Sequence, residues 1–312
     1  MSNYYLLHKG DFAYNKSYSS EYPWGAIKRL DCYEQGTLSS LYICFKPYSH
    51  VSSDFLTHYF ETSKWHQGIS EIAVEGARNH GLLNVGIQDF FETRHCLPQS
   101  LLEQEKIAKF LNLIEERIAT QNKIIEKLQS LIKGLRVCCM QRVYGNNVYL
   151  SEIAQIYQPQ TISSTELTED GFLVYGANGI IGKYKDYNHE TEQICITCRG
   201  NTCGMVNYTK PMSWITGNAM VINTDKYQDK VCKRYLYHYL SAYNFNSIIS
   251  GSGQPQIVRT PLEKLKITLP TISEQKQKAI IFDKIQDKID INHKVLNLYI
   301  GQKQYLLRQM FI

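Results

Sequence analysis

An internal duplication is the feature that most constrains how this 312-residue chain can fold. The stretch LPQSLLEQEKIAKFLNLIEERIATQNKIIEKL, from Leu97, matches LPTISEQKQKAIIFDKIQDKIDINHKVLNLYI, from Leu269. Both stretches pass from Leu-Pro through Glu-Gln into a long helical pattern. The sequence before each match also corresponds, since LTHYF at 56–60 parallels LYHYL at 236–240. A period of roughly 170–180 residues is too long for a solenoid repeat, so we predict two copies of one domain-plus-helix unit.

Each helical segment carries an apolar stripe with the 4-3 spacing of a coiled coil. In the first segment the stripe comprises positions 107, 111, 114, 118, 121, 125, 128, 132 and 135, and the second stripe lies 171 residues later. The middle position is an amide in both stripes, Gln121 and Asn292. We expect the helices to pair antiparallel so that these amides meet and fix the register, at some cost in stability. The alternative is that each helix packs only on its own domain.

The predicted fold class is α+β, with two mixed α/β domains separated by two long helices that pair as an antiparallel coiled coil. The predicted segments are a partial first domain at 1–96, a central helix at 97–143, a second domain at 144–268 and a C-terminal helix at 269–312. Nothing in 1–96 corresponds to 145–190 of the second copy. We therefore expect the first domain to be incomplete, with unpaired strand edges that favour self-association or dependence on a partner.

Composition is that of a globular protein, with 43% hydrophobic and 20% charged residues. The sequence contains no apolar run long enough to span a membrane and no pattern of a secretory signal. These features predict a cytoplasmic protein whose nine cysteines are reduced. The net charge of +5 permits nucleic-acid binding but does not demonstrate it.

No catalytic or cofactor motif stands out in the sequence. GANGIIGKY at 176–184 resembles a phosphate-binding loop, but Ala177 replaces the first glycine and Tyr184 replaces the Ser or Thr that would hold magnesium. Cys195, Cys198 and Cys203 have partial metal-binding spacing without a fourth ligand. We predict structural thiols, no metal and no catalytic centre; a zinc-dependent hydrolase is the alternative.

Polar and aromatic side chains gather instead in loop-like stretches, where they could contact nucleic acid. Amide and guanidinium groups read base edges, whereas lysines and tyrosine hydroxyls hold phosphates. The alternative is a tyrosine-rich surface for a protein partner, or solvated turns. The candidate DNA-binding residues are Lys16, Tyr18, Trp24 and Lys28 in the first copy; in the second copy they are Tyr175, Asn178, Lys183 and Tyr184, then Arg199, Asn201 and Thr202, then Trp214, Thr216 and Asn218, and Gln254.

Over essentially its whole length the chain resembles the specificity (S) subunits of type I restriction–modification enzymes. The motifs that carry the resemblance are KGDFAYNKSYSSEYPWGAIKRLD, EGARNHGLLN, LPQSLLEQEKIAKFL, YGANGIIGKY, ITCRGNTCG, SWITGNAM, GSGQPQ and LPTISEQKQKA. The resemblance implies two target-recognition domains that read a bipartite DNA site and two helices that act as a spacer. By comparison with this family, the first domain lacks roughly its first third.

The resemblance also implies a non-catalytic chain that serves host defence. Its expected partners are double-stranded DNA, two methylation subunits and a motor-nuclease subunit. No cofactor is expected in this chain, because S-adenosylmethionine, ATP and magnesium would act in those partners. The alternative is a truncated regulatory protein that binds methylation subunits through its helices without reading DNA.

Overall fold

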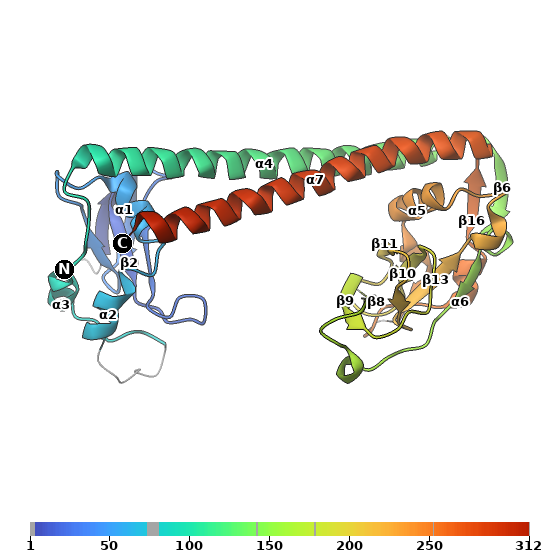
Figure 1. The fold of residues 1–312 in the computed structure, drawn as a ribbon, viewed down its shortest axis with the longest axis horizontal. Coiled ribbons are helices and arrows are strands. Elements are labelled where there is room, and N and C mark those ends of the chain that lie inside the picture. Colours follow the sequence, from blue (N-terminus) through green and yellow to red (C-terminus); the bar gives the residue numbers. More distant parts are fainter. Residues whose placement is uncertain (1–3, 74–80, 142, 178, 252, 312) are drawn as a thin grey trace. The chain divides into compact units, whose positions relative to one another are not determined.

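The computed structural model describes residues 4–73, 81–141, 143–177, 179–251 and 253–311 (Figure 1). The chain divides into a first unit, residues 1–124 with 293–312, and a second unit, residues 125–292. The division cuts through both long helices, α4 (Leu101–Gln141) and α7 (Ile272–Met310), so each unit contains part of both. The predicted boundaries, which give the helices segments of their own, stay a prediction. Within the described ranges, no helix is apolar over enough of its length to cross a membrane.

The second unit is built on an antiparallel four-stranded sheet of order β11-β10-β13-β7. These strands are β11 (Val206–Tyr208), β10 (Ile194–Thr197), β13 (Ala219–Asn223) and β7 (Gln155–Tyr157). Because side chains alternate along a strand, β10 and β13 bury residues on both faces of the sheet. One face packs on helix α5 (Lys233–Ala242) and the other on a three-stranded sheet, β12-β8-β9.

The strands of that second sheet are β12 (Trp214–Ile215), β8 (Phe172–Gly176) and β9 (Gly179–Tyr184). Two short antiparallel pairs complete the strands: β6 (Asn146–Tyr149) with β16 (Lys266–Leu269), and β14 (Ile249–Ser250) with β15 (Gln256–Ile257). Helix α6 (Arg259–Glu263) precedes β16. The remaining helical turns are η1 (Leu150–Glu152), η2 (Ser164–Glu166), η3 (Asp225–Tyr227) and η4 (Phe245–Ile248).

The first unit contains a three-stranded antiparallel sheet of order β3-β2-β5 and a separate β1-β4 pair. Its core is aromatic, because Phe12 and Tyr14 of β2 pack against Phe55 and Phe90 from the helices and against Trp65, which directly precedes a helix. The strands are β1 (Tyr4–His8), β2 (Phe12–Asn15), β3 (Ala26–Arg29), β4 (Gln35–Ser39) and β5 (Ile43–Phe45); the helices are α1 (Ser53–Tyr59), α2 (His66–Ile72) and α3 (Ile87–Glu92).

The repeated Glu-Gln motif has the same structural role in both units. In the first, Gln104 accepts a hydrogen bond from the backbone N–H of Ser52 (2.7 Å) and donates one to the Pro98 carbonyl (2.8 Å). In the second, Gln275 accepts from Cys232 N–H (2.9 Å) and donates to the Pro270 carbonyl (2.9 Å). Both glutamines are buried. Each therefore joins the start of a long helix to the start of the domain helix, which confirms that the duplication is structural.

The predicted apolar stripes are confirmed within each unit. In the second unit, Ile132 of α4 packs against Phe282 and Ile289 of α7. In the first unit, Leu111 and Ile114 of α4 are buried, and the two helices run in opposite directions (Figure 1). Gln121 is 8% exposed and belongs to the first unit, whereas Asn292 belongs to the second. Their pairing stays a prediction.

Candidate nucleic-acid interface

Several loops of the second unit meet at the end of β10, around Cys198. This residue is fully buried, its backbone N–H donates to the Asn218 carbonyl (3.1 Å), and its carbonyl accepts from Ile257 N–H (3.0 Å). Its thiol also donates to the Asn218 carbonyl (3.1 Å). Residues 199–204, 216–218 and 253–256 are thereby held at one end of the sheet.

The same place gathers two further loops. The Gln158 amide donates to the Gly217 carbonyl (3.2 Å), which brings in the residues after β7. The Thr197 hydroxyl donates to the Ala177 carbonyl and so anchors the β8-β9 turn. Sequence reasoning did not single out Gln158, although its position in the polar stretch QPQT, directly after a strand, is a signal that could have found it.

The exposed side chains at this end of the sheet are those suited to contacts with base edges. Arg199, Asn201, Asn218 and Gln254 are exposed, and Thr202 is half-buried. Their backbone is fixed, because Arg199 forms a bridge with Gln256 and the Gly200 N–H donates to the Pro255 carbonyl (2.9 Å). Gly200 has a φ of 84°, a left-handed conformation that favours glycine. The structure thus brings together the second predicted set, part of the third, and Gln254.

Two predicted contacts, Tyr175 and Thr216, lie inside the unit. Tyr175 is 6% exposed in β8, where it faces the contact between the two sheets, and its hydroxyl accepts a hydrogen bond from Lys210 N–H (3.1 Å). Burial raises the pKa of this hydroxyl. Thr216 is 2% exposed, and its N–H donates to the Tyr175 carbonyl (2.9 Å). The prediction that both are exposed at turns is wrong, because strand alternation and the strand-to-turn junction direct them inward.

The first predicted set does not form a single turn. Lys183 and Tyr184 lie in β9, and Tyr184 pairs with Phe172 at the end of the hairpin farthest from its turn. Lys183 contacts Asp170 (3.1 Å), and the Tyr184 ring lies edge-on to Trp214, with 5.0 Å between centroids. These residues form a second, half-buried cluster on the β12-β8-β9 sheet. Asn178 lies outside the described residues.

In the first unit, a β-bridge holds the segment after β2. The segment after β10 in the second unit is held in the same way. Ser17 forms a bridge with Leu82, as Arg199 does with Gln256. Tyr18 is 59% exposed, and its N–H donates to the Gly81 carbonyl (2.6 Å). Residues 75–80, the first part of the predicted segment EGARNHG, lie outside the described ranges.

The other first-unit candidates differ in exposure. Lys16 is half-buried, and its carbonyl accepts from Leu83 N–H (2.9 Å). Trp24 is half-buried against the aromatic core. Lys28 is exposed and lies 3.9 Å from a Glu61 oxygen. Tyr18 and Lys28 therefore remain available for contacts, whereas Trp24 mainly packs.

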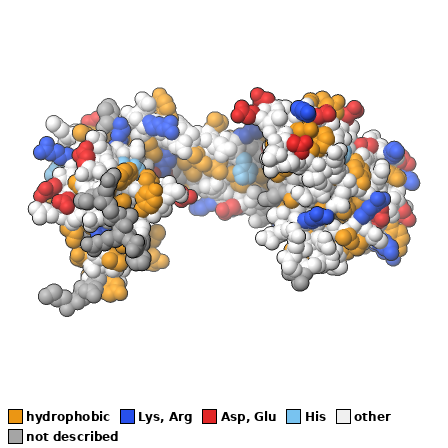
Figure 2. Space-filling view, turned by 90° about the horizontal axis from the view of Figure 1, so that it is seen from below, with side chains coloured by type: hydrophobic (Ala, Val, Ile, Leu, Met, Phe, Trp, Pro, Cys, Tyr) orange, Lys and Arg blue, Asp and Glu red, His pale blue; other side chains and the backbone are white. Residues whose placement is uncertain are grey.

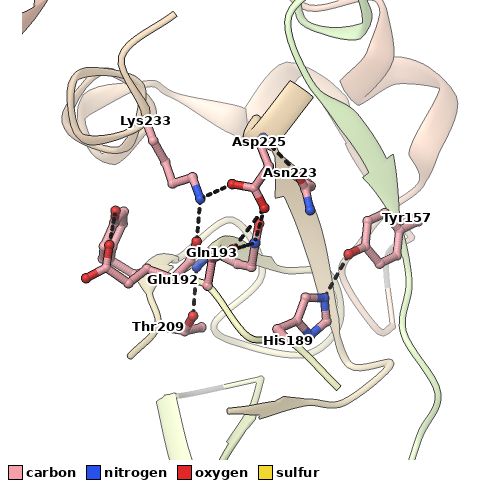
Figure 3. Close-up of polar contacts among 10 residues, drawn as sticks. Tyr157, His189, Glu192, Gln193, Thr209, Asn223, Asp225 and Lys233 are labelled. Atoms are coloured by element: carbon pink, nitrogen blue, oxygen red, sulfur yellow. Dashed lines mark hydrogen bonds and ion pairs between the residues drawn. The ribbon is translucent and has the colours of Figure 1, made fainter. Parts of the chain in front are cut away.

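A polar network fixes the opposite end of the second unit's sheet (Figure 3). Asp225, after β13, accepts hydrogen bonds from Gln193, Thr191 and Lys233 (2.5–3.0 Å). Burial alone would raise the pKa of Asp225, but these donors outweigh it and lower the pKa. The Tyr157 hydroxyl lies 2.8 Å from His189 Nε2. These groups join β7, β10, β13 and α5, so their role is to hold the sheet.

Metal-binding geometry is restricted to one group of residues within the described part of the chain: His58, Glu61 and Glu115. The Lys303 ammonium lies 2.7 Å from Glu61 and 2.6 Å from Glu115, and so already pairs with both carboxylates. Cys195 and Cys198 are buried on opposite faces of the sheet, in different clusters. Burial raises the pKa of Cys195. This placement supports the interpretation that these are structural thiols.

Charge does not gather into one large patch on the face seen in Figure 2, where basic and acidic side chains occur on both units. On this face, recognition of an acidic polymer must therefore depend on local contacts. The loops around Cys198 offer such contacts.

Comparison with known proteins points to the same family that the sequence motifs resemble. Residues 146–298 match the family described as type I restriction modification DNA specificity domain. The chain is also 31% identical, over 147 residues, to the type I restriction enzyme EcoprrI specificity subunit of Escherichia coli. Residues 146–298 therefore form a type I restriction specificity domain. That alignment covers 46% of this chain and 36% of the relative, so the matched stretch spans about a third of the relative's length.

The fold of the chain is shared with solved structures. The type I restriction–modification S subunit from M. genitalium has a TM-score of 0.66 at 16% identity, covering 98% of this chain and 83% of that one. A chain from a structure concerning complex assembly and conformational transition of the type I restriction–modification system has a TM-score of 0.61 at 15% identity. This match covers 98% of the present chain and 82% of the chain in that structure. At these identities the likeness shows the fold alone.

Proposed function

We propose that this chain is the non-catalytic DNA-specificity subunit of a type I restriction–modification complex. The observation that carries the proposal is the convergence of loops around Cys198, which presents Arg199, Asn201, Asn218 and Gln254 at one end of a rigid sheet. Arg is suited to guanine, and Asn and Gln to adenine. Because the loops are joined by backbone hydrogen bonds, little ordering is required when DNA binds.

The second unit is proposed to read one half of a bipartite target and the first unit the other half, with the long helices as the spacer. Tyr18 and Lys28 are the exposed first-unit candidates for contacts with DNA. The proposed setting is the cytoplasm, with two methylation subunits and a motor-nuclease subunit as partners. Those subunits would use S-adenosylmethionine, ATP and magnesium.

The test is DNA binding by the complex reconstituted with its methylation subunits, using a duplex library to find the preferred site. Arg199→Ala should cost about 1–3 kcal/mol and relax one base position. Lys226→Ala is the matched control, because Lys226 is an exposed cation in η3, after the opposite end of β13. Lys183→Ala removes a proposed phosphate contact and should therefore weaken binding to all DNA sequences alike. Equal effects of Arg199→Ala and Lys226→Ala would contradict the proposed surface.

A mismatch scan across the preferred site tests the division between the units. Each mismatch in the half-site of the second unit should cost about 1–3 kcal/mol. Mismatches in the other half-site should cost less, since the described part of the first unit has fewer strands to support its loops. Equal penalties in both halves would show that the first unit reads its half-site fully. Binding that is independent of sequence and of salt would instead favour an interaction protein that does not read DNA.

A further inference from the structure

The loop that follows β2 in the first unit begins with the same backbone contacts as the loop that follows β10 in the second. In both units a β-bridge is flanked by two hydrogen bonds to a segment farther along the chain. The first-unit contacts are the Ser17–Leu82 bridge, Tyr18 N–H to the Gly81 carbonyl (2.6 Å) and Leu83 N–H to the Lys16 carbonyl (2.9 Å); the second-unit contacts are the Arg199–Gln256 bridge, Gly200 N–H to the Pro255 carbonyl (2.9 Å) and Ile257 N–H to the Cys198 carbonyl (3.0 Å). Ser17 therefore corresponds to Arg199.

The two loops also end at equivalent glycines. Strand β3 pairs with β2 as β11 pairs with β10, and this register makes Gly25 the counterpart of Gly204. Both glycines have a left-handed φ, 75° and 91°. A Cβ on Gly25 would collide with the Asn15 carbonyl oxygen, so this close approach requires glycine. The first-unit loop comprises residues 18–24 and is three residues longer than its counterpart, 200–203.

The extra length of the first-unit loop forms a tight turn. Ser19 and Tyr22 exchange both of their backbone hydrogen bonds (3.1 Å each), which leaves Ser20 and Glu21 at the tip. The Ser19 hydroxyl also accepts a hydrogen bond from the Tyr22 N–H (3.0 Å). Because the loop is fixed at both ends and closed at its tip, little ordering is required when it contacts a ligand.

The side chains of this turn point to the chemistry of that ligand. Residues 17–22 are all exposed, and Glu21 forms no hydrogen bond or ion pair within the part of the chain that the structure describes. A carboxylate beside DNA is repelled by the phosphates, so it is favourable there only where it accepts a hydrogen bond from a base. The base-edge donor that suits glutamate is the N4 amino group of cytosine in the major groove.

We propose that Glu21 is a specificity-determining residue of the first unit, and that it accepts a hydrogen bond from the N4 amino group of a cytosine in the first half-site. This inference rests on the proposed function, in which the first unit reads one half of the target. The major groove is wide enough to admit a two-stranded turn of this kind. Lys28 lines the same hollow as Glu21, and its side chain is 65% exposed. It can hold a phosphate and so offset the charge of Glu21.

The test uses the complex reconstituted with its methylation subunits and the duplex library that identifies the preferred site. The native complex should prefer cytosine at one position of the first half-site, and Glu21→Ala should reduce that preference at least about fivefold. Glu21→Gln should shift the preference at the same position to adenine, because glutamine pairs with the adenine edge. Glu92→Gln is the matched control, since it removes the same charge from an exposed position in α3. It should leave every base preference unchanged.

The outcomes separate this inference from the proposed function on which it rests. If both Glu21 variants keep the native base preferences in the first half-site while mismatches in the second half-site remain costly, the role of Glu21 is wrong and the proposed function stands. An equal shift with Glu92→Gln would also overturn that role, because loss of charge would then be the cause. A native complex without base preference in either half-site would contradict the proposed function and this inference together.

Discussion

His238 Nε2 lies 2.8 Å from Asp283 Oδ1, and this contact joins the domain helix α5 to the long helix α7 within the second unit. Arg136 of α4 lies 2.8 Å from the other ring nitrogen, Nδ1. Since arginine only donates, His238 accepts at Nδ1, is neutral, and donates from Nε2 to Asp283. The first unit repeats the arrangement, because His58 Nε2 lies 2.8 Å from Asn112 Oδ1. Both histidines are buried.

Replacing Asp283 should separate its contact with His238 from its ion pair with Arg234. Asp283→Ala should lower the free energy of unfolding by about 2–4 kcal/mol, because it leaves buried His238 and partly buried Arg234 without an acceptor. Asp283→Asn should cost less, since an amide oxygen can still accept from the histidine, as Asn112 does. Urea denaturation of the full chain measures both changes. An equal loss in the two variants would show that the ion pair, not the histidine contact, is what stabilises this site.

Stability should fall on acidification through His238. Burial lowers the pKa of His238 below its ordinary value of 6.5. The unfolded chain therefore binds a proton more readily, so this contribution is fully present above pH 6.5 and is lost as the pH falls below it. The difference in unfolding free energy between the native chain and His238→Gln, measured from pH 7.5 to 5, should shrink toward acid. A difference that grows toward acid would contradict a neutral buried histidine.

The two repeated glutamines should have similar energetic roles. Gln104→Ala and Gln275→Ala each leave a buried backbone N–H and a carbonyl without their side-chain partner, so each should cost about 1–3 kcal/mol. Gln129→Ala, at an exposed position of α4, is the control and should change stability by less than about 0.5 kcal/mol. Thermal unfolding measures all three. A loss of stability in only one of the two variants would show that the two glutamines do not contribute equally to the stability of the fold.

The central amides Gln121 and Asn292 are predicted to meet across the long helices. Replacing both with Leu should raise the stability while loosening the register, since a buried polar pair specifies register at a cost in stability. A double-mutant cycle of Gln121→Leu and Asn292→Leu should give a coupling energy of at least about 0.5 kcal/mol. Strict additivity of the two single changes would contradict the pairing.

The sequence by itself determined the duplication, the two long helices and the class of side chains expected at the recognition surface. Periodicity is a local property, so the 4-3 stripe shows which face of α4 is buried, and Leu111 and Ile132 lie on that face. The Leu-Pro and Glu-Gln motifs recur because Gln104 and Gln275 make the same local contacts. Arg199 and Asn201 were recognisable because a Gly-containing stretch between two strand patterns predicts a turn.

Only the tertiary structure decided which candidates lie together. Tyr175 and Thr216 lie next to predicted turns, as Arg199 does, yet packing inside the unit buries them, and no local pattern records which face a second sheet covers. Cys198 was interpreted as a small buried residue, and its position as the contact point of several loops depends on residues 20 to 59 positions away in the chain. That β5 is an edge strand among the described residues likewise emerged only from comparing strand pairing in space, because an edge exists only relative to the strands beside it.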